Sequence, residues 1–170
     1  MSLLSYLLSL PHLISFNEYF RLLSESTRYA TLLHVFAPWR GLPPDATLAI
    51  SHLLHRLISF LQPLLVLKLE DQRAMEGEMQ SEISTLIFWI VAVGGIAAKG
   101  APEWKWFAGR LKDMCDELGV KVWNDWQEVV QRAIWHDILC KPLHKQLWNE
   151  VQLLRDQDNA LEIHRGDSDV

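Results

Sequence analysis

Apolar residues recur at three- and four-residue steps along most of this chain, which is the spacing of one face of a helix. Strand-like alternation of apolar and polar residues is rare, and leucine is abundant. The pattern predicts helices over residues 17–36, 45–63, 86–98, 102–118, 124–138 and 142–155. The polar run over residues 70–82 is either a loop or the exposed start of the third helix.

Local signals predict where several of these helices begin and end. Asn17 and Asn124 have the side chain of a helix N-cap, and Gly119 suits the position just after a helix end. Pro63 is expected to end or kink the second helix, since an internal proline removes a backbone hydrogen bond. Pro102 and Pro142 suit the first turn of a helix. The chain after about residue 155 is polar and predicts a flexible tail.

Residues 86–98, LIFWIVAVGGIAA, form a run of thirteen apolar or small residues without a charge. A membrane-spanning helix needs about 20 apolar residues, and this run is flanked by Glu82 and Lys99. It matches neither a dinucleotide-binding nor a P-loop pattern. Gly94 and Gly95 cost helix propensity but let another helix approach closely. The run therefore predicts the central buried helix of the fold.

These elements predict an all-α fold: a single helical domain of six or seven packed helices over residues 1–155, followed by a polar tail over residues 156–170. A chain of 170 residues suffices for one such domain. An alternative use of the apolar residues 1–16 is attachment to a membrane surface, which requires that segment to be exposed.

The net charge of −5 argues against a self-contained nucleic-acid binder, which normally has a basic face. Cys115 and Cys140 lie far apart and at no zinc-binding spacing, so two free thiols are expected. We predict no metal, no cofactor and no membrane span.

Individual candidate sites are better explained by structure than by catalysis. His52 and His55 share one helix face, but the HExxH pattern is absent. His136 and Asp137 are neighbours on a helix and therefore point about 100° apart. Cys115 lies on an apolar stripe and is expected to be inert. No catalytic residue is predicted.

Eight tryptophans are the most distinctive feature of the composition. Trp104 and Trp126 fall on predicted inner faces, whereas Trp106 and Trp123 do not. Core packing against neighbouring helices is the simpler explanation of these two rings. A partner or ligand surface formed by Trp106, Trp123 and His136 is the alternative.

The segment over residues 82–152 resembles the C-terminal part of the regulatory domain of fungal zinc-binuclear-cluster transcription factors. The resemblance rests on GGIAA at residues 94–98, Trp106-Phe107, Leu118-Gly119, Trp123, Trp135 to Asp137, and Leu147 to Glu150. The family binds DNA through an N-terminal module in which six cysteines hold two zinc ions. These 170 residues contain two cysteines, so that activity is not carried over.

The resemblance implies a non-enzymatic regulator, located in the nucleus or otherwise in the cytoplasm, and linked to a metabolic or secondary-metabolite gene cluster. Its expected partner is a full-length regulator, a second copy or a small effector, with no direct nucleic-acid binding. The alternative function is a small helical ligand-binding protein or enzyme of a biosynthetic pathway. A tryptophan-lined pocket with His136 or Asp137 would favour that alternative.

Overall fold

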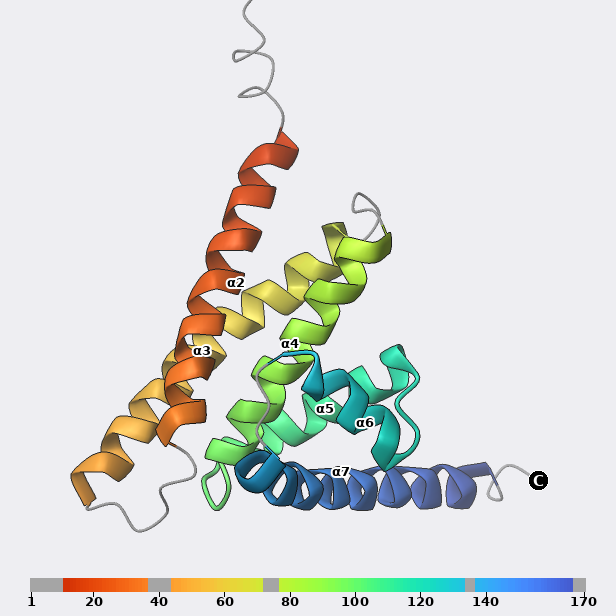
Figure 1. The fold of residues 1–170 in the computed structure, drawn as a ribbon. Helices are drawn as coiled ribbons and strands as arrows, with labels where there is room; N and C mark the ends of the chain where they lie inside the picture. The colour runs from red at the N-terminus through yellow and green to blue at the C-terminus, as the bar shows by residue number, and fades with distance from the viewer. Residues whose placement is uncertain (1–10, 37–43, 72–76, 134–136, 167–170) are drawn as a thin grey trace, which may run out of the picture. The chain divides into compact units, whose positions relative to one another are not determined.

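The computed structural model describes residues 11–36, 44–71, 77–133 and 137–166 (Figure 1). Within these ranges the chain forms helices and no strand, so the predicted all-α fold is confirmed. The helices are α2 (Pro11–Phe36), α3 (Pro44–Asp71), α4 (Gly77–Ala97), α5 (Trp104–Leu118), α6 (Trp123–Gln131) and α7 (Asp137–Gly166).

The chain divides into two compact units, Met1–Ser84 and Thr85–Val170, and the boundary lies inside α4. In the first unit α2 and α3 form an antiparallel hairpin and pack side by side (Figure 1). The rings of Tyr29 and Phe60 stack across it, with centroids 5.6 Å apart.

The hairpin buries one stripe from each helix. Leu54, Leu57, Leu61 and Leu64 of α3 follow three- and four-residue steps and are fully buried. On α2 the stripe comprises Tyr19, Leu22, Leu23, Ser26, Ala30 and Leu33. Serine and alanine at its centre leave room for close approach of a neighbouring helix. Both stripes have the three- and four-residue spacing of a helix face that is buried against a neighbouring element.

The two helices of this unit extend past the ends that the sequence predicts. Asn17 lies within α2, which already begins at Pro11, so it is not an N-cap. Pro63 lies within α3, which continues to Asp71. An internal proline costs about 3 kcal/mol of helix propensity. Leu61 and Leu64 on either side of Pro63 are fully buried, and their burial offsets this cost. The predicted start at Asp45 is correct to within one residue.

In the second unit, α5, α6 and α7 pack around the later half of α4. Every residue from Ile87 to Val93 is buried, as expected for a central helix. Phe88 meets Trp126 of α6, Gly94 lies against Phe107 of α5, and Gly95 lies against Leu147 of α7. α7 also contacts α5 and α6 (Figure 1). The prediction of a buried helix over residues 86–98 is therefore confirmed.

The end of α5 is formed as the sequence predicts. Gly119 has φ 68° and ψ 26°, a left-handed conformation that glycine adopts without the steric cost of a Cβ. The N–H of Val120 then donates to the carbonyl of Cys115 at 2.8 Å, which satisfies a terminal carbonyl of the helix. At the other end, Pro102 lies in the turn that precedes α5 and not in its first turn.

The predicted boundary between the last two helices is wrong. α6 begins at Trp123 and ends at Gln131, and Asn124 lies inside it. The carboxylate of Asp125 accepts hydrogen bonds from the N–H groups of Lys121 and Val122, at 2.9 and 3.0 Å. These bonds lower the pKa of Asp125. An acid in the first turn thus does the capping that we assigned to Asn124.

The last helix is longer than predicted at both ends. α7 begins at Asp137, so Pro142 lies within it and does not open it. The helix continues to Gly166, through most of the stretch predicted as a polar tail. Cys140 and His144 are buried on the side of α7 that also carries Trp148 and Val151. This continuous buried face explains why the helix extends across the proline.

Among the residues that the structure describes, two helical stretches are long and apolar enough to cross a membrane, Thr47–Leu67 and Gln80–Ala97. Of the second, 67% is buried inside the protein, as in the core helix of a soluble fold. The first is 22% buried, and its outer side carries His52, His55 and Gln62. Those polar side chains would have to enter the bilayer with it, which is costly.

Candidate functional site

An aromatic cluster centred on Trp126 occupies the interior of the second unit. Trp126 is fully buried and meets three rings edge-on: Phe88 of α4 at 4.9 Å between centroids, Trp148 of α7 at 5.5 Å, and His144 of α7 at 6.3 Å. Edge-to-face pairs at these separations stabilise a core beyond the area that they bury. The cluster therefore joins α4, α6 and α7.

His144 supplies the polar partner that a buried indole needs. The Nε1–H of Trp126 donates to Nδ1 of His144 at 3.4 Å. In this arrangement Nδ1 is the acceptor, so the proton of a neutral ring is on Nε2. His144 is 1% exposed, which leaves it no access to a substrate. We assign it to the core.

Trp106 and Trp123 occupy half-buried positions on different helices. Trp106 packs edge-on against Phe107, and the guanidinium of Arg110 lies 5.8 Å from the centre of its ring. Trp123 begins α6, and the ammonium of Lys145 from α7 lies 4.7 Å from its ring centre. Each ring thus pairs with a cation. His136, the third residue of the candidate surface, lies outside the described residues.

The histidines of α3 do not form a metal site in the part of the chain that the structure describes. His52 and His55 both lie on the exposed side of the helix, and Nδ1 of His55 is 3.0 Å from the carbonyl oxygen of Ser51. Among the described residues no group of three or more histidine, cysteine or acidic side chains is placed to hold an ion.

Cys115 and Cys140 are both buried thiols, with no disulfide bond between them. Cys115 is fully enclosed on the inner side of α5, and burial raises the pKa of its thiol to about 12. A nucleophilic cysteine needs a lowered pKa and access to solvent. The environment of Cys115 is therefore that of an inert core residue, in agreement with its place on the predicted apolar stripe.

The burial of Cys115 predicts slow thiol chemistry and a loss of stability at high pH. We expect neither cysteine to react with a water-soluble disulfide reagent at pH 8 until the protein is unfolded. The folded thiol stays neutral up to about pH 12, whereas an unfolded thiol ionises from about pH 8.5. Its contribution to stability is thus complete at neutral pH and is lost as the pH rises.

At pH 10 this loss is about 2 kcal/mol of unfolding free energy. It can be measured by denaturant unfolding of the wild type and of Cys115→Val at pH 7.5 and pH 10. The variant lacks the thiol and should lose less stability between the two values. Equal losses, or rapid labelling of the native protein, would show that Cys115 is accessible.

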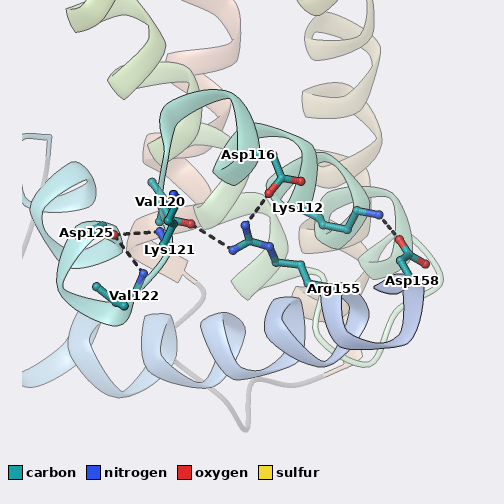
Figure 2. Close-up of polar contacts among 8 residues, drawn as sticks. All are labelled: Lys112, Asp116, Val120, Lys121, Val122, Asp125, Arg155 and Asp158. Carbon is teal, nitrogen blue, oxygen red and sulfur yellow. Dashed lines mark hydrogen bonds and ion pairs between the residues drawn. The ribbon is translucent and has the colours of Figure 1, made fainter. Parts of the chain in front are cut away.

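Arg155 links α7 to the turn that joins α5 and α6 (Figure 2). Its guanidinium donates to the carbonyl of Val120 at 3.1 Å and to the carboxylate of Asp116 at 2.5 Å. One turn further along α7, Asp158 pairs with Lys112 of α5, which raises the pKa of that lysine. Arg155 therefore satisfies the backbone carbonyl of Val120, the residue after the left-handed Gly119.

We expect Arg155→Met to cost more stability than Lys112→Met. Arg155 is 19% exposed and satisfies a backbone carbonyl, so its loss should cost about 1–2 kcal/mol. The pair formed by Lys112 and Asp158 is an ion pair between two partly exposed side chains and should contribute about 0–1 kcal/mol. Urea unfolding of the two variants tests this order. Equal losses of unfolding free energy would contradict the role that we assign to Arg155.

Sequence reasoning missed both His144 and Arg155. A signal for His144 was present: it continues the series Cys140, Leu147 and Val151 at three- and four-residue steps. No local signal identifies Arg155, because its two partners lie at positions 116 and 120 and are brought near only by folding.

These features define a helical protein with a dense aromatic core and two half-buried tryptophans paired with cations. Comparison with known protein families, with curated proteins and with solved structures gives no match.

Proposed function

We propose that this chain is a non-enzymatic regulatory domain, similar to the regulatory domain of fungal zinc-cluster transcription factors. It acts by binding a protein partner or a small effector. One observation supports this most directly. The segment that resembles the family, residues 82–152, begins three residues before the compact unit Thr85–Val170. It includes all the buried core residues of that unit in the described part of the chain.

The half-buried Trp106 and Trp123 are the proposed contact residues. Tryptophan is enriched among the residues that carry the binding energy of protein interfaces, and its ring gives a large contact area at low entropic cost. The Lys145 ammonium over the Trp123 ring belongs to α7, so this contact joins α6 and α7. The proposal locates the protein in the nucleus.

A reporter assay tests the proposal. The full chain is fused to an unrelated DNA-binding module and expressed in a fungal cell that carries the matching reporter gene. We expect reporter output to change severalfold relative to the module alone. We expect Trp123→Ala to weaken the change, while Glu128→Gln, an exposed substitution on the same helix, leaves it intact. An unchanged output at equal protein levels would contradict the proposal.

The same proposal predicts no salt-sensitive binding to duplex DNA by the chain alone. Its net charge is −5, and a DNA contact surface requires an excess of basic residues. Fluorescence anisotropy with a labelled duplex over a range of salt concentrations measures this. Tight binding with a steep salt dependence would show that the chain has a DNA-binding surface of its own.

A further inference from the structure

One exposed stripe of α2 has a regular pattern of charges. Glu18, Arg21, Glu25 and Arg28 follow each other at steps of three, four and three residues, so the acid–base pattern repeats after seven residues. The stripe continues with Leu32 and Val35. We call these six residues the α2 stripe. It lies away from the stripe of α2 that is buried in the hairpin.

The charges pair within their own helix. Arg21 donates two hydrogen bonds to the carboxylate of Glu18, at 2.8 and 2.6 Å, and these bonds lower the pKa of that acid. Arg28 lies 3.6 Å from Glu25. All four side chains are 30–65% exposed, so they remain accessible to an incoming surface.

The charge pattern of the α2 stripe is complementary to itself. A second α2 helix that runs antiparallel, with a twofold axis near residue 23, places its Arg28 opposite Glu18 and its Glu25 opposite Arg21. A parallel, in-register copy places like charges opposite each other. An isologous interface uses the same surface on both subunits, and only the antiparallel arrangement makes this surface complementary to itself.

Apolar side chains on the outside of the same helix provide contact area. Leu32 and Val35 are among the large hydrophobic residues that remain exposed in the described part of the chain, and in the antiparallel arrangement they lie opposite positions 14 and 11 of the other copy. Removing such groups from water favours association, whereas exposed ion pairs mainly select orientation. Together they favour one occupant, which is a second copy of the same helix.

We propose that the protein forms an antiparallel homodimer through the α2 stripe. The inference rests on the proposed function in one respect, since it names the second copy as a protein partner. The interface pairs Glu18 with Arg28 and Arg21 with Glu25 across the two copies, twice each by symmetry. The charges within one helix exchange their partners when the dimer forms.

A charge-swap experiment on the full chain tests the dimer. Glu18→Arg with Glu25→Arg makes the stripe wholly basic, and Arg21→Glu with Arg28→Glu makes it wholly acidic. Sedimentation equilibrium should show a wild-type dimer and at least about tenfold weaker self-association of each double variant. An equimolar mixture of the two variants should form a heterodimer. Far-ultraviolet circular dichroism checks that all proteins are folded.

The control is Glu128→Arg, which disrupts an exposed ion pair with Arg132 on α6 and should leave the dimer intact. A wild type that stays monomeric over the measured range overturns the proposal, as does a dimer that both double variants retain. Two monomeric variants that fail to associate when mixed also overturn the antiparallel pairing. A monomer would leave the proposed function standing, because the reporter assay tests that separately.

Discussion

Replacing Gly94 with alanine is expected to destabilise the protein, although alanine is the better helix former. A Cβ at this position would lie 2.2, 2.6 and 2.8 Å from three carbons of the Phe107 ring. Phe107 is fully buried, so its ring has no free space to enter. Overpacking of this kind costs more than the gain of about 1 kcal/mol in helix propensity.

The net loss should be about 1–3 kcal/mol of unfolding free energy, which urea unfolding followed by circular dichroism can measure. Gly109→Ala is the matched control, because no atom lies within 4 Å of a Cβ built there and the residue is inside α5. That variant should be as stable as the wild type or more stable by up to about 1 kcal/mol. The same sign for both variants would contradict the close approach of α4 and α5.

Trp126→Ala is expected to have the largest effect of any single truncation. Its side chain is fully buried and contacts rings from α4 and α7. Its removal leaves a cavity and takes away the indole donor of the His144 ring. Truncation of a buried aromatic residue costs about 3–5 kcal/mol. For a domain of marginal stability, much of the folded population would be lost.

The control is Trp123→Ala, at the start of the same helix. Trp123 is half-buried and contacts the Lys145 ammonium, so its loss should cost about 1 kcal/mol or less. Thermal melts of the two variants should differ clearly. If they are equal, Trp126 is not the centre of the core. Trp126→Phe separates the indole hydrogen bond from ring packing and should be milder than the alanine variant.

The parts of the fold that the sequence predicted correctly each have a signal within a short stretch of the chain. The uncharged run over residues 86–98 predicted the central buried helix, because no other location suits that many apolar residues in a row. Gly119 predicted the end of α5, because the left-handed conformation favours glycine wherever it occurs. The apolar position of Cys115 likewise predicted its burial.

The errors share a physical cause. Pro63 was expected to end or kink its helix and Pro142 to open one, but both lie inside helices, because a stripe of buried side chains continues through each and outweighs the local cost. Asn124 is a good cap in isolation, yet Asp125 is the residue in reach of the free N–H groups. The Arg155 contacts join positions more than thirty residues apart and have no signature in either segment.

The unit boundary inside α4 has a practical consequence for dissecting the chain. Most domains can be separated at an exposed linker, but here a cut between Ser84 and Thr85 falls within hydrogen-bonded helix. It would create a new helix start whose first N–H groups lack carbonyl partners. Two of them belong to Ile87 and Phe88, which are fully buried. A stable C-terminal fragment must therefore keep the whole of α4 from Gly77, and the shared helix would have to be duplicated if each half were to stand alone.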